Sequence, residues 1–219
     1  EEFAAIDLNT PLSDINQVLE ELDHLYLKHA IYFHHQDYLA HLNCPVMLTS
    51  LLAELFSSSI NTAVETWDQS AGATLIEQKV IDWTCQRIGY DEGADGVFTT
   101  GGTQSNLMAL LLARELAGKL EPHSHTNITS GLSSNAHRYR ILCSEYSHFS
   151  IQKAAALLGL GHDAVISVAC DENRCIDPHS LENTLNELQR ANLLPIAVIA
   201  TAGTTDFGAI DPIASIAHL

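Results

Sequence analysis

The stretch of sequence that decides the fold is VFTTGGTQSNLMALLLARE, at residues 97–115. Its apolar residues and threonines favour a short strand over residues 96–100, and Gly101-Gly102 then allows a sharp turn. The residues after the turn are mostly helix formers with apolar side chains at helical spacing, so we expect a helix over residues 103–116. A strand, a glycine turn and a helix in this order are typical of an α/β protein.

The same alternation continues towards the C-terminus. We predict strands at residues 139–144, 164–169 and 196–201, and helices at residues 147–158 and 177–191. The polar stretch at 121–138 predicts a surface loop, and Asp211-Pro212 resembles the N-cap and first position of a further helix. Strands that alternate with helices indicate a mostly parallel sheet with helices on both faces, which also suits the apolar strand at 196–201.

Upstream of residue 93 the pattern is helical. We predict helices at residues 13–33, 45–61 and 74–89, with Ser13 as the first N-cap and Thr74 and Glu77 as a capping box. An aromatic, histidine-rich loop at residues 32–45 separates the first two helices. The sequence therefore predicts a helical N-terminal segment over residues 1–92 and an α/β domain over residues 93–219.

Composition excludes several classes of function. The 219 residues include 27 acidic and 10 basic side chains, for a formal net charge of −17. Such a chain is a poor ligand for nucleic acid or anionic membranes, because phosphate contacts need clustered lysine and arginine. It contains no apolar run of about 20 residues that could span a bilayer, and its N-terminus does not resemble a secretory signal.

The cysteines favour a reducing compartment. Five cysteines at wide spacing, without a CxxC motif, predict free thiols and a cytoplasmic protein. A zinc site built from Cys170, Cys175 and His179 is the weaker alternative, and we expect no metal.

The turn at the start of the predicted helix 103–116 is the first candidate for binding. Two glycines permit close backbone approach, and Thr103 and Gln104 present backbone N–H groups at a helix N-terminus, where the helix dipole favours an anion. The motif is neither GxxxxGK[ST] nor GxGxxG, so it is not one of the common nucleotide loops. It predicts a phosphate site, and the alternative is a glycine turn with a threonine cap.

Two further motifs follow predicted strands. His148 lies in SEYSHFS, between the strand at 139–144 and its helix, where an imidazole can stack on a ligand, protonate it, or simply cap or pack. Thr204 and Thr205 lie in TAGTT, after the most apolar strand, and read alone they form a structural turn. Because ligands bind at the carboxyl ends of parallel strands, the three motifs together predict one site for a phosphorylated ligand.

These motifs together resemble the pyridoxal-phosphate-dependent decarboxylases that act on amino acids, which include the glutamate, aromatic and diaminobutyrate decarboxylases. The resemblance covers residues 30–219 and is carried by TTGGTQSN at 99–106, SEYSHFSIQKAA at 144–155 and TAGTTDFGAIDPI at 201–213, with WDQS at 67–70 and HLNCP at 41–45. It is nearest to the bacterial diaminobutyrate-type members. It implies the fold-type I architecture, decarboxylation of an L-amino acid to an amine and CO₂, and a homodimer with shared active sites.

The resemblance also implies roles for individual residues. Gly102, Thr103 and Gln104 would hold the cofactor phosphate. His148 would stack on the pyridine ring as the catalytic residue, and Thr204 and Thr205 would lie against the cofactor. His41 and Asn43 would reach the substrate, and Glu65 would line the neighbouring subunit's site, where a carboxylate suits a substrate with a second ammonium group.

Two functional groups of that family have no counterpart in this sequence. The Schiff-base lysine and the aspartate that protonates the ring nitrogen both follow the helix at Pro212 in the family, and the four lysines at 28, 79, 119 and 153 resemble solvated surface residues. We therefore expect an N-terminal fragment, with an incomplete cofactor-binding domain, that is inactive alone. The alternatives for the parent protein are another fold-type I reaction, by an aminotransferase or a lyase, or a non-catalytic paralogue.

Overall fold

The computed structural model describes residues 2–39, 43–120 and 131–219 of the chain. By its internal contacts the chain divides into two compact units, residues 1–84 (unit 1) and 85–219 (unit 2), and each is described by itself. The boundary expected from the sequence, between residues 92 and 93, remains a prediction.

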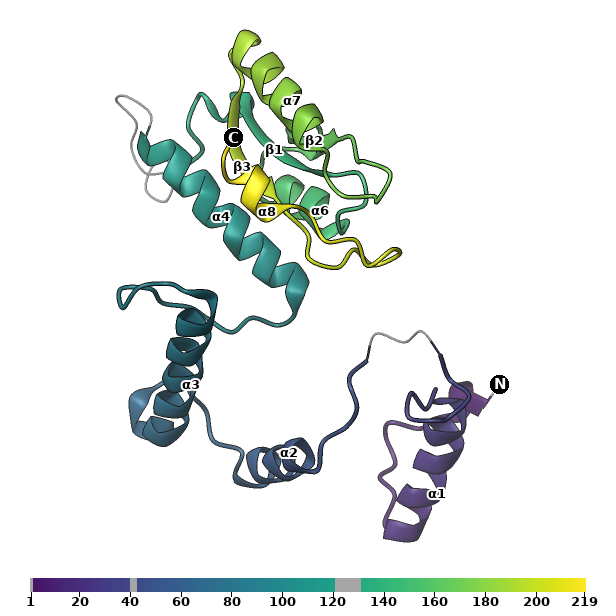
Figure 1. Ribbon diagram of the computed structural model, residues 1–219. Helices are drawn as coiled ribbons and strands as arrows, with labels where there is room; N and C mark the ends of the chain where they lie inside the picture. Colours follow the sequence, from purple (N-terminus) through teal and green to yellow (C-terminus); the bar gives the residue numbers. More distant parts are fainter. Residues whose placement is uncertain (1, 40–42, 121–130) are drawn as a thin grey trace. The chain divides into compact units, whose positions relative to one another are not determined.

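Unit 2 is built on a parallel sheet. Its strands are β1 (Tyr139–Ser144), β2 (Val165–Val168) and β3 (Leu194–Ile199), in the order β2-β1-β3 (Figure 1). The three strands predicted after residue 138 are confirmed, although β3 begins two residues earlier than expected. The central strand β1 is almost wholly buried, as a strand covered on both faces should be.

Helices cover both faces of this sheet. Unit 2 contains α4 (Gly102–Leu120), α6 (Ser150–Leu157), α7 (Pro178–Arg190) and the short α8 (Ile213–Ile216), with single 3-10 turns η3 (Ala136–Arg138) and η4 (His162–Ala164). Helices α4 and α6 pack on one face, and α7 and α8 pack on the other. The arrangement confirms the predicted α/β class.

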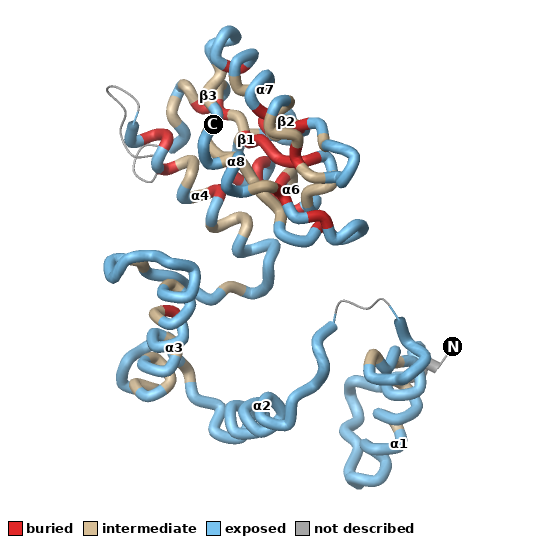
Figure 2. The backbone as a smooth tube through the Cα atoms, viewed as in Figure 1, coloured by how far each residue is buried: buried red, intermediate tan, exposed pale blue. Residues whose placement is uncertain are grey.

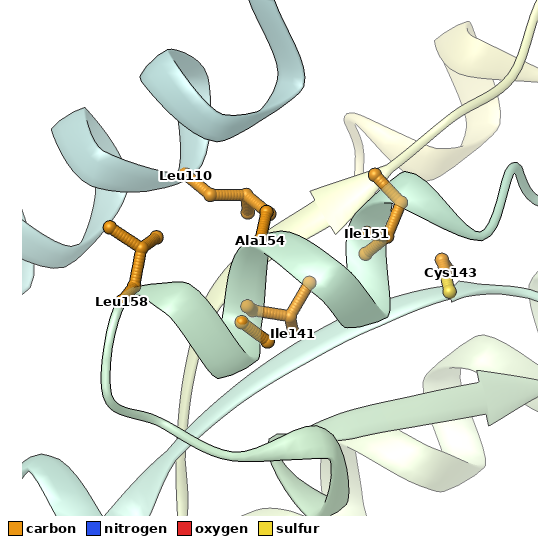
Figure 3. Close-up of a cluster of buried hydrophobic side chains, with 7 residues drawn as sticks. Leu110, Ile141, Cys143, Ile151, Ala154 and Leu158 are labelled. Atoms are coloured by element: carbon orange, nitrogen blue, oxygen red, sulfur yellow. The ribbon is translucent and has the colours of Figure 1, made fainter. Parts of the chain in front are cut away.

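The alternation of side chains along β1 divides the core into two layers. Ile141 and Cys143 point to one face and join Leu110 of α4 and Ile151 of α6, a cluster drawn in Figure 3. Leu142 points to the other face, where it meets Leu181 and Leu188 of α7. Figure 2 shows the buried residues of unit 2 concentrated on the sheet and on the helix faces against it.

The strand predicted at residues 96–100 does not form. A strand is stabilised by a paired neighbour, and the three described strands of the sheet pair only with one another. Val97 and Phe98 are both about 60% exposed instead of buried in a sheet. The predicted loop at 121–138 can be followed only in part, because residues 121–130 lie outside the described residues; its last three residues form η3.

The expected cap of the last helix is also wrong. Pro212, and not Asp211, is the N-cap of α8. The Asp211 carboxylate is turned away from the helix and accepts backbone hydrogen bonds from Ile176 and Thr201. By contrast, Asp177 caps α7, with Pro178 at the first helical position, which agrees with the start of the helix predicted at 177–191.

Unit 1 consists of helices. They are η1 (Glu2–Ala5), α1 (Ile15–Leu25), η2 (Leu27–His29), α2 (Leu48–Ile60) and α3 (Trp67–Ile88), the last of which extends four residues into unit 2. Helix α1 is shorter than the predicted helix 13–33, and its N-cap is Asp14, which accepts a hydrogen bond from the Asn16 N–H, instead of Ser13.

Helix α3 begins seven residues before the predicted start. Thr74 lies inside it and donates a hydrogen bond to the Ser70 carbonyl, so the predicted capping box does not form. Ser70 itself has non-helical backbone angles, which kink the helix after its first turn. The capping signal at Thr74 therefore falls one turn after the kink and not at the helix start.

The described helices of unit 1 bury very little. Ile81 in α3 is their one buried residue, and every apolar side chain of α1 and α2 is at least partly exposed (Figure 2). Helix α2 alone exposes six large apolar side chains: Leu48, Leu51, Leu52, Leu55, Phe56 and Ile60. Over the described residues, no helix combines the length and hydropathy needed to cross a bilayer.

Candidate functional site

The candidate site lies at the carboxyl ends of the strands of unit 2. The segment after β1 carries His148, and the segment after β3 carries the threonine turn. The Ser147 hydroxyl lies 3.3 Å from the Thr201 hydroxyl, which joins these two segments. An edge of this kind is where open parallel sheets bind ligands.

The turn before α4 leaves room for a ligand at its backbone. Gly101 has φ +92°, a conformation that favours glycine, and a Cβ added at Gly101 or Gly102 would meet no atom within 4 Å. The Gln104 N–H is used in a hydrogen bond to the Gly101 carbonyl, 3.1 Å away. Within the described structure the N–H groups of Gly102 and Thr103 have no such partner, so these two N–H groups are the donors offered at the helix N-terminus.

Side-chain hydrogen bonds close this turn on itself. The Gln104 Oε1 atom accepts hydrogen bonds from the backbone N–H and the hydroxyl of Thr100. The hydroxyls of Thr99 and Ser105 lie 2.6 Å apart. Gln104 therefore contributes by shaping the turn, while the exposed Thr103 hydroxyl remains available beside the two free N–H groups.

The imidazole of His148 is held in place from α4 and α6. Its Nδ1 lies 2.8 Å from the hydroxyl of Ser150, and that hydroxyl accepts a 2.8 Å hydrogen bond from the side-chain amide of Asn106. The ring stacks on Phe149 with 4.2 Å between centroids and is otherwise exposed. Since Asn106 lies one helical turn after Gly102, the predicted phosphate turn and the predicted stacking residue are linked by hydrogen bonds.

The two threonines differ in exposure. Thr204 is buried, and its hydroxyl accepts a hydrogen bond from the Ala209 N–H at 3.1 Å, which stabilises the turn over residues 204–209. Thr205 is exposed and presents its side chain to solvent. Of the two predicted contacts to a cofactor, Thr205 is thus the accessible hydroxyl and Thr204 stabilises the turn that carries it.

The motifs did not identify the residue that fixes the turn over residues 204–209 to the other segments at the carboxyl ends of the strands. Asp211 is 4% exposed, and its two carboxylate oxygens accept the backbone N–H groups of Ile176 at 2.8 Å and Thr201 at 2.7 Å. It ties the segment after β2 to the segment after β3. The Asp-Pro signal at this position was sufficient to suggest a helix cap, and nothing local indicates the two distant N–H groups.

Two cysteines lie near the carboxyl ends of the strands, Cys143 in β1 and Cys170 after β2. All five cysteines are free, and burial raises the pKa of the Cys143 and Cys170 thiols, which keeps them protonated and poorly nucleophilic. The described residues contain no cluster of three or more histidine, cysteine or acidic side chains that could hold a metal ion.

The residues predicted to reach the substrate belong to unit 1. Asn43 lines a cavity of about 540 Å³ whose other lining residues include Tyr26, Tyr32 and Phe33. His41 lies outside the described residues, and Glu65 is exposed. Their roles toward a substrate remain predictions.

Comparison with known proteins defines the class. The sequence profile of the pyridoxal-dependent decarboxylase conserved domain matches residues 5–219, so the chain belongs to the pyridoxal-dependent decarboxylase family, whose cofactor is pyridoxal phosphate. The donors found at the edge of the sheet fit this cofactor: two free N–H groups and a hydroxyl at a helix N-terminus suit its phosphate, and an exposed imidazole suits its ring.

Within this family the chain is similar to L-2,4-diaminobutyrate decarboxylases. It is 40% identical to that of Acinetobacter baumannii over 211 residues, which cover 94% of this chain and 41% of the relative. It is 39% identical to that of Rhizobium meliloti (strain 1021) over 218 residues, which cover 98% of this chain and again 41% of the relative. The chain therefore spans about two-fifths of the length of these relatives.

Solved structures agree with the fold. The glutamate decarboxylase domain of diaminobutyrate-pyruvate transaminase and L-2,4-diaminobutyrate decarboxylase from Vibrio parahaemolyticus superposes with a TM-score of 0.92 at 39% identity, over 99% of this chain and 47% of that one. Mouse CSAD in its apo form superposes with a TM-score of 0.87 at 28% identity, over 99% of this chain and 44% of that one. The fold-type I architecture expected from the motifs is thereby confirmed.

Proposed function

We propose that this chain is part of a longer enzyme that decarboxylates an L-amino acid, with L-2,4-diaminobutyrate as the first candidate substrate. The observation that carries the proposal is the family match over residues 5–219. It is supported by the hydrogen bonds that join the turn before α4, the segment of His148 after β1 and the threonine turn after β3. The relatives named L-2,4-diaminobutyrate decarboxylase, at 39–40% identity, support this choice of substrate.

The residues at the edge would divide the binding of the cofactor among them. The N–H groups of Gly102 and Thr103 and the Thr103 hydroxyl would hold its phosphate, and Gln104 would keep their turn in shape. His148 would cover the ring, and Thr205 would offer it a hydroxyl. Pyridoxal phosphate, when bound, supplies the electron sink that allows the bond between Cα and the carboxylate to break.

The proposal is tested on the protein produced from the full reading frame that encodes this chain. Purified with pyridoxal phosphate and incubated with L-2,4-diaminobutyrate, it should release CO₂ and the corresponding diamine, both measured over time. Formation of an oxo acid instead would assign the protein to the aminotransferases. Absence of any product with this and other L-amino acids, in a protein that fails to bind the cofactor, would favour a non-catalytic paralogue.

We also propose that the 219-residue chain cannot bind the cofactor covalently. All four lysines, at residues 28, 79, 119 and 153, are exposed, so none lies in enclosed surroundings that would hold the cofactor against its amine. The chain is mixed with pyridoxal phosphate, treated with borohydride and digested, and its peptides are analysed by mass spectrometry. We expect scattered, substoichiometric labelling. A single lysine labelled stoichiometrically would overturn the proposal.

The apolar helices of unit 1 support a homodimer. A soluble monomer rarely exposes large contiguous apolar surface, yet α1 and α2 bury no side chain in unit 1. We propose that a second copy covers these faces, in keeping with the shared active sites that the motifs imply. Free cysteines further support a site of action in the cytoplasm, where thiols stay reduced.

Sedimentation equilibrium tests the dimer. The chain should associate as its concentration rises, and Leu51→Glu with Leu55→Glu should abolish association because both substitutions place a charge on the exposed apolar face of α2. Ser57→Glu adds one charge to the same helix and should leave association unchanged. An unaltered chain that stays monomeric at its highest soluble concentration would contradict the proposal.

A further inference from the structure

The hydrogen bonds of His148 restrict where its ring proton can lie. The backbone N–H of Ser150 points at Nδ1, with 3.2 Å between the nitrogen atoms. A backbone N–H can only donate, so Nδ1 must keep its lone pair free to accept. A neutral ring with an unprotonated Nδ1 carries its proton on Nε2.

The Ser150 hydroxyl fits the same direction of donation. It lies 2.8 Å from Nδ1, and because Nδ1 accepts, the hydroxyl must donate. Its oxygen can then accept the 2.8 Å hydrogen bond from Asn106 Nδ2. Donation therefore runs in one direction, from the Asn106 amide to the Ser150 hydroxyl to the His148 ring.

Burial makes this arrangement difficult to exchange. Ser150 is 0% exposed, so no water can replace either partner of its hydroxyl. The opposite tautomer would direct an Nδ1–H at the Ser150 N–H, donor against donor. It would also force the hydroxyl to accept from both the ring and Asn106, leaving its own proton without an acceptor in this group.

We propose that Ser150 is a positioning residue which, supported by Asn106, fixes the neutral His148 ring with its proton on Nε2. The exposed edge of the ring then presents an N–H donor to an acceptor oxygen of whatever molecule occupies the site. Because Asn106 belongs to α4, the same hydrogen bonds set the ring relative to the helix whose N-terminus offers Gly102 and Thr103. Only the identity of the bound molecule rests on the function proposed above; the tautomer does not.

Nuclear magnetic resonance of the 219-residue chain, labelled with ¹⁵N in its histidines and free of cofactor, tests the proposal. Correlations between the ring nitrogens and carbon-bound ring protons distinguish a pyridine-like nitrogen from a pyrrole-like one. His148 is assigned by the signal lost in His148→Gln. At a pH where the ring is neutral, we expect a fully pyridine-like Nδ1 and a fully pyrrole-like Nε2. Exposed histidines such as His179 should show averaged values, and a His148 signal that is equally averaged, or reversed, would overturn the proposal.

Three variants separate positioning from general structural support. Ser150→Ala should shift both nitrogens of His148 towards the averaged values, since Nδ1 then keeps only the backbone N–H. Asn106→Ala should shift them in the same direction by less. Ser147→Ala makes the same chemical change three residues earlier, in a hydroxyl that contacts Ser144 and Thr201, and should leave the His148 signals unchanged.

The outcomes decide the proposal independently of catalysis. A folded Ser150→Ala protein whose His148 signals match those of the unaltered chain would overturn the role of the hydroxyl. If Ser150→Ala loses its fold, the dispersion of its amide signals will collapse. The His148 signals of the unaltered chain and of Asn106→Ala, a change at a partly exposed residue, then decide the proposal. Since no cofactor or substrate is present, failure here leaves the decarboxylase proposal standing, and failure of that proposal leaves this one standing.

Discussion

Helices α1 of unit 1 and α7 of unit 2 are similar in sequence pattern and opposite in environment. Both are capped by an aspartate and both carry apolar side chains along one face. In α7 this face is covered by the sheet, and Leu181 is 0% exposed. In α1 the equivalent face is open, and Leu22 is 46% exposed.

The difference teaches what an amphipathic pattern does and does not specify. Periodicity determines which face of a helix is apolar, but the surface that covers this face is supplied by the rest of the fold. In unit 2 the parallel sheet supplies it. In unit 1 the described residues supply no equivalent surface, so most of the stability of these helices must come from contacts outside the unit, which is the reasoning behind the proposed second copy.

The largest expected effect comes from removing a side chain from the apolar face of α7, compared with the same change on α1. Leu181→Ala should destabilise unit 2 by about 2–5 kcal/mol, because it removes a buried side chain and leaves a cavity. Leu22→Ala should change stability by about 0.5 kcal/mol or less at concentrations where the chain is monomeric. Both are measured by urea denaturation followed by far-ultraviolet circular dichroism.

The tryptophans give an independent check on the same pair of variants. Trp67 and Trp83 both lie in unit 1, so their fluorescence reports on that unit. Leu181→Ala should shift the circular dichroism transition and leave the fluorescence transition nearly unmoved. Equal losses of stability from Leu181→Ala and Leu22→Ala would show that the apolar face of α1 is covered within the chain as that of α7 is.

The next largest effect concerns the hydrogen bonds by which Asp211 joins the segment after β2 to the segment after β3 at the candidate site. Asp211→Ala should cost about 2–4 kcal/mol, because it leaves the buried N–H group of Ile176 and the part-buried N–H group of Thr201 without their acceptors. Asp206→Ala is the matched control, since Asp206 is an exposed aspartate in the same segment and its loss should cost about 0.5 kcal/mol or less. The free energy of unfolding in urea measures both, and a similar small loss for the two variants would assign Asp211 no special part in the edge.

The contrast between the two units also explains what could be predicted from the sequence. The three strands and α7 were predictable because their apolar residues pack in or against the core of unit 2, where pattern and environment agree. The strand at 96–100 was not, because a strand depends on a neighbour that local sequence does not reveal. The start of α3 differs from the prediction for another reason: the Thr74 capping pattern resembles a helix boundary, whereas the helix continues across a kink at Ser70.

The candidate site shows the same limit. His148, Thr103 and Thr205 could be selected from motifs, because each lies directly after a predicted strand or turn. Asn106 and Asp211 could not, since their partners lie 44 residues away in one case and 35 and 10 residues away in the other. Residues that position other residues act through tertiary contacts, which the spacing of a motif does not encode.

The smallest expected effect compares the two helix caps directly. Asp177→Ala should destabilise unit 2, because α7 packs on the core and the Asp177 carboxylate accepts the N–H groups of His179 and Ser180 at its start. Asp14→Ala should only fray the first turn of α1, visible as faster amide exchange there and not as a change in the urea transition. The loss from Asp177→Ala should be smaller than that from Asp211→Ala, since Asp177 is only partly buried and water can replace part of its cap, whereas Asp211 is buried.

The cap of α7 should also carry a pH dependence of known sign. The hydrogen bond from the Ser180 hydroxyl is the largest cause that lowers the pKa of the Asp177 carboxyl below its ordinary value of about 3.9. A group whose pKa is lower in the folded state stabilises the protein above the unfolded pKa, and this contribution is lost as the pH falls through the folded pKa. The difference in stability between the unaltered chain and Asp177→Asn, which keeps a capping oxygen but cannot titrate, should therefore be constant near neutral pH and decline below about pH 4. A difference that grows on acidification would mean that the carboxylate is not stabilised in the folded state.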